Sequence, residues 1–279
     1  MVERRTWELN YTETDLDFVV GVTAPAAANQ EHLKQLLRGD ETFRVAMVSD
    51  ERVFQQVMND EEIFLKISAP LYFEVLLRKT LRELETATHT VERTGRQNIP
   101  VFDTKEVVNL LSRPEVLDYL AQMLASFTRI HSYTVPVRVA RGIRRRIRYN
   151  DMDIDSLIRF CTTADEEHRL GFYKRIADVC LFVSSFFPDY AFFDYRYPTT
   201  GQTHPLAVGR MRRSLEDYER EGRTFYGLAE EHPVARALQF SEVFGLLREH
   251  FTSARKPLSF IATHYLHARK QALFGVQAK

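Results

Sequence analysis

The segment 164–186 constrains the fold most, because its pattern is that of a helix enclosed by other elements. Thr163 and Glu166 have the spacing of a capping box at its start, and Pro188 follows its last apolar residues. From Ile176 onward, apolar side chains occupy nearly every face of the predicted helix. A helix of this kind needs neighbours on all sides, which predicts a compact bundle of several helices.

Helical periods and helix start signals continue through most of the chain. Ser68 and Pro70 open a helix whose apolar stripe includes Phe73 and Leu84. Asp103 and Glu106 have the spacing of a further capping box. Capping boxes and apolar periods predict further helices near 104–111, 113–129, 206–230, 233–252 and 257–272. We therefore expect a mainly α fold with about eight or nine helices. The alternation of Trp7, Leu9 and Tyr11 suggests one additional strand near the N-terminus.

The composition is that of a globular protein with balanced charge. The chain has 38 basic and 38 acidic residues among 279, and 44% of its residues are hydrophobic. A net charge of zero argues against a protein whose main task is to coat nucleic acid. Because no linker, repeat or low-complexity stretch divides the chain, we expect a single helical domain over residues 1–279. A sub-boundary, if there is one, is expected near 130–150.

Three features favour a cytoplasmic location without membrane association. Cys161 and Cys180 lie in apolar stretches and lack metal-ligand spacing, which is typical of reduced core cysteines. The N-terminal residues contain no apolar core of a secretion signal. The longest apolar run, 179–187, is far too short to cross a bilayer.

A β-hairpin is predicted at residues 133–149 (YTVPVRVARGIRRRIRY), and we call it the arginine hairpin. The glycine of its central Ala-Arg-Gly fits the left-handed position of a three-residue loop. This loop places Val139 opposite Ile143 and Arg138 opposite Arg144. It also pairs Val135 with Ile147 and Tyr133 with Tyr149. A two-residue loop would mix the apolar and basic faces, and a helix with a narrow apolar stripe is the remaining alternative.

Six arginines lie in this hairpin, and the predicted register sorts them by face. Four of them share one face: Arg138, Arg144, Arg146 and Arg148. Like charges directly opposite each other are unfavourable unless an anion lies nearby. The acids Asp151, Asp153 and Asp155 are the simplest source of that negative charge, and solvation of an edge strand is a second explanation. The functional interpretation is a binding site for phosphate, nucleic acid or an acidic protein.

Asp178 is a carboxylate in the most apolar part of the predicted central helix. Burial without a partner would be costly, so we expect an ion pair with Lys174 or Arg175 one turn back. The alternative is an internal polar site, in which a hairpin arginine or a ligand reaches Asp178. The aromatic stretch 190–197 would then be a lid or stacking surface, whereas otherwise it is a loop pinned onto the core.

Motifs of well-known enzymes are missing from the sequence. We find no glycine-rich phosphate loop, no G-x-S-x-G, no H-E-x-x-H and no C-x-x-C. Weak candidates for metal ligands are two pairs at helical spacing, Asp165 with His168 and His264 with His267. Histidines near a helix C-terminus, where the dipole stabilises them, are the simpler interpretation. We therefore expect no metal and no cofactor, and we favour a protein that is not an enzyme.

The segment 178–188 (DVCLFVSSFFP) resembles an element of the form GDxxLFxSGFFP in uncharacterised bacterial helical proteins. Ala177 and Ser185 stand where that pattern has glycines. The resemblance covers only the second half of the chain. It implies a bacterial, helical protein that is not secreted, and it assigns no site and no activity.

Two classes of function follow from these patterns. The first is a non-catalytic regulatory or assembly protein that binds an acidic protein or a nucleic acid through the arginine hairpin, with homo-oligomerisation left open. The second is an enzyme or small-ligand binder with an internal polar site around Asp178 and 190–197. An exposed arginine face favours the first class, and a cavity lined by Asp178, an arginine and aromatic side chains favours the second.

Overall fold

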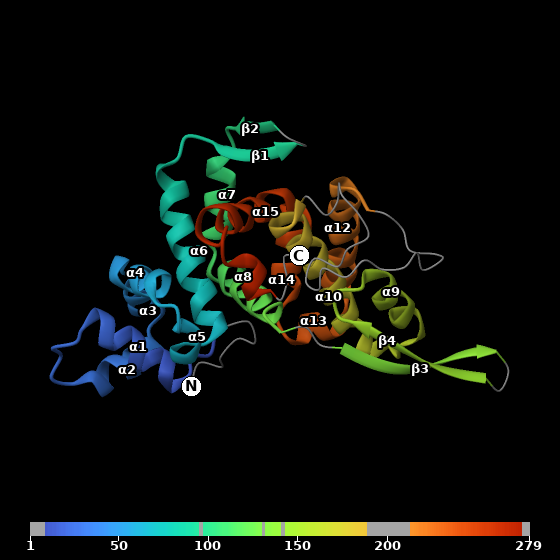
Figure 1. The fold of residues 1–279 in the computed structure, drawn as a ribbon, viewed down its shortest axis with the longest axis horizontal. Helices are drawn as coiled ribbons and strands as arrows, with labels where there is room; N and C mark the ends of the chain where they lie inside the picture. Colours follow the sequence, from blue (N-terminus) through green and yellow to red (C-terminus); the bar gives the residue numbers. More distant parts are fainter. Residues whose placement is uncertain (1–8, 95–96, 130–131, 141–142, 189–212, 275–279) are drawn as a thin grey trace. The chain divides into compact units, whose positions relative to one another are not determined.

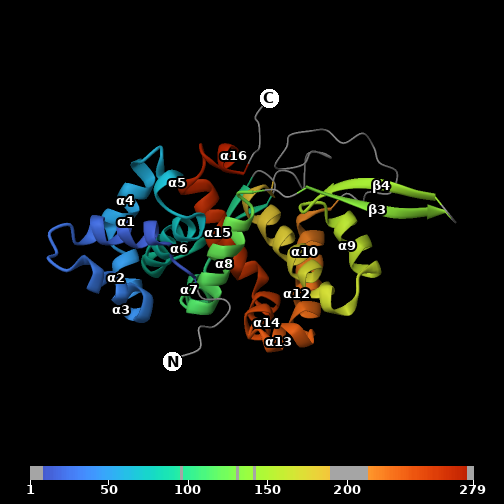
Figure 2. The ribbon, with the colours of Figure 1, turned by 90° about the horizontal axis from the view of Figure 1, so that it is seen from below.

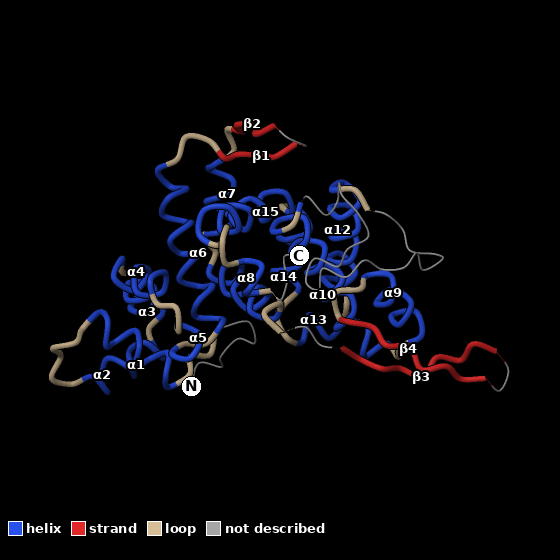
Figure 3. Tube along the Cα trace, viewed as in Figure 1, coloured by secondary structure: helices blue, strands red, loops and turns tan. Residues whose placement is uncertain are grey.

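The computed structural model describes residues 9–94, 97–129, 132–140, 143–188 and 213–274, and for strands β3 and β4 it describes the backbone. The described residues are mainly helical and include two antiparallel β-hairpins, which confirms the predicted mainly α class (Figures 1 and 3). Helices are more numerous than the expected eight or nine, because helices over residues 13–66 and over Ile154–Thr163 were not individually predicted and the predicted helix 233–252 is divided. The chain forms two compact units, Met1–Ala125 with Lys256–His267 and Ser126–Arg255 with Ala268–Lys279.

The first unit is built around one long helix. It comprises α1 (Glu13–Thr23), α2 (Gln30–Gly39), α3 (Glu41–Val48), α4 (Glu51–Asn59), α5 (Ile63–Lys66), α6 (Ala69–Thr86), β1 (Thr90–Thr94), β2 (Gln97–Val101), α7 (Thr104–Leu111) and most of α8 (Pro114–Ser126). Every residue of α6 from Leu71 to Arg78 is buried. Helix α6 is therefore the enclosed core element of this unit.

In the first unit, helices begin after Ser68 and Asp103 as predicted, but only Ser68 of these two makes a capping hydrogen bond. Ser68 caps α6, since its hydroxyl accepts a hydrogen bond from the Leu71 backbone N–H, and α7 has the predicted bounds. Asp103 stands at the N-cap position of α7 but makes no capping hydrogen bond. Its carboxylate instead accepts a hydrogen bond from the Thr90 hydroxyl at 2.6 Å and contacts the Lys256 ammonium. The predicted capping box is wrong here because Asp103 holds β1 and α15 (Phe251–Phe260) instead.

The second unit contains β3 (Ser132–Ala140), β4 (Ile143–Asn150), α9 (Ile154–Thr163), α10 (Glu166–Phe186), α12 (Leu215–Glu231), α13 (Pro233–Ala237), α14 (Ser241–Glu249), the start of α15 and α16 (Lys270–Leu273). Every residue of α10 from Ile176 to Phe186 is buried, as its all-round apolar pattern predicts. Its Phe182 ring stacks on Phe127 with 4.2 Å between centroids. Asp165, not Thr163, precedes α10 as the N-cap residue.

Three sequence-based element boundaries are wrong. The predicted helix 233–252 is divided into α13 and α14, because Gln239 adopts a left-handed backbone with φ of 60°. Pro257 lies inside α15 rather than at a helix start, and a π-helical turn follows at Ile261–Tyr265. Of the predicted N-terminal strand, Trp7 lies outside the described residues, and Leu9 and Tyr11 are not in a strand. Helix α1 follows directly, with a capping box of Thr12 and Asp15. The hairpin of β1 and β2 was not predicted at all.

Gly222 in α12 lies where a side chain has no room. A Cβ built there collides with the Phe251 ring and lies 3.1 Å from Cys180 Cβ. Replacing Gly222 with alanine is expected to lower the free energy of unfolding by about 1–3 kcal/mol through overpacking, although alanine favours a helix by about 1 kcal/mol. Chemical denaturation followed by circular dichroism measures the change.

Gly171 in α10 supplies the matched control for this substitution. No atom lies within 4 Å of its built Cβ, so Gly171→Ala is expected to stabilise the protein by about 0.5–1 kcal/mol. Equal effects of the two substitutions would contradict the close packing of α12 on Phe251.

Candidate functional site

The arginine hairpin is present at the predicted place, as strands β3 and β4. Its register agrees with the prediction at three pairs: Tyr133 with Tyr149, Val135 with Ile147, and Arg138 with Arg144. Near the connection the prediction is wrong, because Ala140 rather than Val139 pairs with Ile143. The register shifts between Arg138 and Ala140, and such a bulge takes up one extra residue in β3. Because of the bulge, Arg138 still pairs with Arg144 as predicted, although only two residues lie between the ends of the two strands.

The remaining arginines of the predicted face follow at alternate register positions of β4. Arg146 pairs with Pro136 and Arg148 with Thr134, whereas Arg145 at the intervening position pairs with Val137. Figures 1 and 2 show that the hairpin extends beyond α9, away from the helices of its unit. The chain therefore places four arginine positions along a two-stranded ribbon.

The acids that follow the hairpin have partners in the helices of the second unit. Asp151 Oδ2 lies 2.6 Å from the Arg175 guanidinium, which also donates to the Ser126 hydroxyl and stacks on the Phe127 ring. Asp153 accepts a hydrogen bond from the Ser156 hydroxyl at 2.7 Å. Each carboxylate thus has a contact that anchors the base of the hairpin to the helices.

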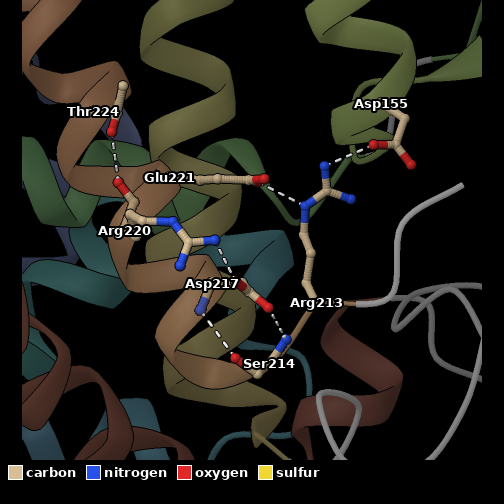
Figure 4. A network of polar contacts seen from close by, with 7 residues as sticks. All are labelled: Asp155, Arg213, Ser214, Asp217, Arg220, Glu221 and Thr224. Atoms are coloured by element: carbon tan, nitrogen blue, oxygen red, sulfur yellow. Dashed lines mark hydrogen bonds and ion pairs between the residues drawn. The ribbon is translucent and has the colours of Figure 1, made fainter.

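Asp155 belongs to a network centred on Arg213 (Figure 4). The Arg213 guanidinium lies 2.7 Å from Asp155 of α9 and 2.7 Å from Glu221 of α12, and its side chain is only 9% exposed. Ser214, the next residue, forms a capping box with Asp217 at the start of α12. This arrangement ties α9 to α12, so Asp155 has a structural role.

Asp178 is fully buried, and side chains of the described residues contact both of its oxygens. Lys174 donates to Oδ2 at 2.6 Å, which confirms one of the two expected pairs, and Arg175 contacts Asp151. The Tyr226 hydroxyl of α12 donates to Oδ1 at 2.9 Å, a contact that sequence reasoning missed. Asp178 therefore joins α10 to α12. The aromatic stretch 190–197 lies outside the described residues.

The weak metal candidates have local structural surroundings. Asp165 is the N-cap residue of α10, and its backbone carbonyl accepts a hydrogen bond from the His168 N–H. His264 lies in the π-helical turn and stacks on Phe260 at 3.9 Å. His267 is exposed. Among the described residues, no three His, Cys, Asp or Glu side chains are grouped so as to hold a metal ion.

A buried charge cluster in the first unit was missed by the sequence reasoning. It consists of Tyr11, Arg44 of α3, Glu74 and Arg78 of α6, and Asp118 of α8. The Arg78 guanidinium lies 2.7 Å from Glu74, and the Tyr11 hydroxyl donates to the same carboxylate at 2.5 Å. Arg44 lies 3.2 Å from Asp118, and the side chains of Glu74 and Asp118 are fully buried. The cluster links three helices through two fully buried carboxylates and two mostly buried guanidinium groups.

Burial changes the acid–base properties of this cluster. Desolvation first, and the charge of Glu74 second, raise the pKa of Asp118 to about 7. Burial also raises the pKa of Tyr11 well above its ordinary value. Asp118 Oδ1 and Arg44 Nε are buried without a hydrogen-bond partner. Asp118 is therefore a carboxyl group that keeps its proton to a higher pH than an ordinary aspartate does.

No family model, curated protein or solved structure matches this chain. The resemblance of segment 178–188 to uncharacterised bacterial proteins stays a prediction. Within the described ranges, no helix is both long enough and apolar enough to cross a membrane.

Proposed function

We propose that this protein is a non-catalytic regulatory or assembly protein that binds an anionic macromolecule through the arginine hairpin. The residues assigned to binding are Arg138, Arg144, Arg146 and Arg148. The observation that carries the proposal is the pairing of Arg138 directly with Arg144 in a ribbon that extends beyond α9 (Figure 2). Like charges at directly paired positions destabilise a hairpin, and a bound anion removes that cost.

One acid that follows the hairpin supports the proposal. Asp155 is already within ion-pair distance of Arg213. A carboxylate in contact with a guanidinium has less capacity to neutralise another arginine. Lys174 and Tyr226 donate hydrogen bonds to the two oxygens of Asp178. Because protein side chains already engage this carboxylate, the contacts argue against the alternative, a small-ligand site around Asp178.

The cysteines support the cytoplasmic part of the proposal. Cys161 and Cys180 are both free and buried. Burial raises the pKa of both thiols, which keeps them protonated and unreactive. Free core cysteines are typical of a reducing compartment, and we place the protein in the bacterial cytoplasm.

Chromatography on immobilised heparin, a sulfated polyanion, tests the proposed function. We expect the wild-type protein to elute at a higher salt concentration than a variant with Arg138, Arg144, Arg146 and Arg148 all changed to Gln, because counterion release makes such binding salt-dependent. A charge-matched control changes four exposed arginines outside the hairpin to Gln: Arg52, Arg82, Arg220 and Arg236. Circular dichroism checks that each variant is folded. Elution of the hairpin variant together with the wild type would refute the proposal.

A further inference from the structure

We infer that the anionic partner is double-stranded DNA, with the β3–β4 ribbon lying in its major groove. This inference rests on the proposed function and specifies the partner class. It follows from the shape of the ribbon, the spacing of its arginines and the kind of surface it offers.

The shape of the hairpin fits a duplex groove. Strands β3 and β4 form a two-stranded sheet with no third strand among the described residues, and the ribbon extends beyond α9 (Figure 1). Paired strands lie about 4.8 Å apart. The major groove of B-form DNA is about 12 Å wide and admits a two-stranded ribbon. A hairpin that stands clear of its helices is able to enter such a groove.

The spacing of the arginines favours a polymer over a small anion. Arg144, Arg146 and Arg148 occupy alternate positions of β4, so at about 3.4 Å per residue they span about 14 Å of the ribbon. Arg138 adds a fourth position opposite Arg144. A single phosphate group reaches only one or two of these positions. A partner with negative charge repeated along its length reaches all four.

The residue types favour nucleic acid over an acidic protein. All basic residues of the two strands are arginines, whose planar guanidinium suits phosphate oxygens and guanine edges. Protein–DNA interfaces are much more positively charged than protein–protein interfaces, and four arginine positions on one ribbon agree with that charge. Because the charge of the whole chain is balanced, DNA is attracted mainly to the hairpin. This agrees with a local contact rather than general coating of DNA.

Fluorescence anisotropy with a labelled duplex of about two helical turns, roughly 20 base pairs, tests the inference. We expect the wild-type protein to bind with a salt-dependent affinity. In the triple variant Arg144→Gln, Arg146→Gln and Arg148→Gln, the slope of log K against log salt is expected to fall by about 2.7, since each phosphate contact contributes about 0.9. If the two proteins bind equally at 1 M salt, the triple variant binds about 500-fold more weakly than the wild type at about 0.1 M salt.

Two further variants separate charge from folding. The triple Arg→Lys variant keeps the charge and is expected to keep the salt slope. The control variant Arg82→Gln, Arg220→Gln and Arg236→Gln has the same change in net charge at exposed positions outside the hairpin, and it is expected to bind like the wild type. A loss of binding in the control as large as in the hairpin variant would overturn the inference.

Competing partners are tested with three other labelled probes: the single strand, an RNA duplex of the same sequence, and polyglutamate. The RNA major groove is too narrow to read, so equal binding to duplex RNA overturns the groove assignment. Preference for the single strand overturns it also. Arginine-dependent binding of polyglutamate without binding of duplex DNA refutes the DNA inference and leaves the proposed function intact. If no probe binds and heparin retention is also insensitive to the hairpin arginines, the DNA inference and the proposed function are both refuted.

Discussion

Replacing Glu74 with leucine is expected to lower the free energy of unfolding by about 3–5 kcal/mol, the cost of breaking a buried ion pair. Glu74 is fully buried and accepts contacts from Arg78 and Tyr11. Its removal leaves the Arg78 guanidinium, which is only 8% exposed, without its carboxylate. Urea denaturation followed by far-UV circular dichroism measures the loss.

Two controls give this result its meaning. Glu85 lies on the same helix but is exposed, so Glu85→Leu is expected to change the stability by no more than about 0.5 kcal/mol. The double variant Glu74→Leu and Arg78→Leu removes both charges, and replacement of a complete buried pair by apolar side chains is often neutral. We therefore expect the double variant to recover most of the loss. A single-variant loss below about 1 kcal/mol would show that the pair is not buried as described.

Local signals predicted the helices whose ends they mark. Ser68 caps α6, α7 has its predicted bounds, and the apolar pattern after Ile176 is a fully buried stretch. These predictions succeed because capping and helical period depend on residues a few positions apart. Where the backbone departs from the usual residue preferences, the same reasoning fails. Gln239 takes a left-handed conformation without being Gly or Asn, so nothing in the sequence marks the break between α13 and α14.

Contacts between residues far apart in the sequence could not be predicted from local patterns. Asp103 was assigned to a cap, but Thr90 and Lys256 engage its carboxylate, and Lys256 is far away in the chain. Glu74 and Asp118 carry the same signal that drew attention to Asp178, a carboxylate within an apolar helical stretch. That signal predicts a buried acid in each case. It does not predict that Arg44 and Tyr11, from separate elements, complete the cluster.

For the arginine hairpin, sequence reasoning went further than for any other tertiary feature. Alternation gave the pairing of Arg138 with Arg144, whereas the turn chemistry led to the wrong pairing of Val139 with Ile143 and missed the bulge. Register in a hairpin is fixed by its own two strands, which explains this success. Arg175 and Arg213, which come from later in the chain, contact Asp151 and Asp155 as well, and no sequence pattern indicated these ion pairs. The expectation that these acids neutralise the hairpin arginines stays a prediction, because only the backbone of β3 and β4 is described. No local pattern pairs residues across such separations.

The stability of the protein relative to its Asp118→Asn variant is expected to fall as the pH rises. Burial raises the pKa of Asp118 to about 7, whereas an unfolded aspartate has a pKa of about 3.9. The folded state therefore holds a proton that the unfolded state has released. The stabilising contribution of this proton is complete below about pH 4 and is lost as the pH rises through about 7. This direction is opposite to that of an aspartate in an exposed salt bridge.

The size of the effect follows from the difference between the two pKa values, and it is on the order of 2–4 kcal/mol over the whole range. Asparagine keeps the shape of Asp118 and its oxygen can still accept from the Leu9 N–H and from Arg44, but it does not titrate. All other side chains are the same in the two proteins, so their contributions cancel in the difference. Urea denaturation of both proteins at several values between about pH 5 and pH 8 gives that difference. A difference that does not change with pH would mean that Asp118 is ionised throughout, with Arg44 outweighing both its burial and the charge of Glu74.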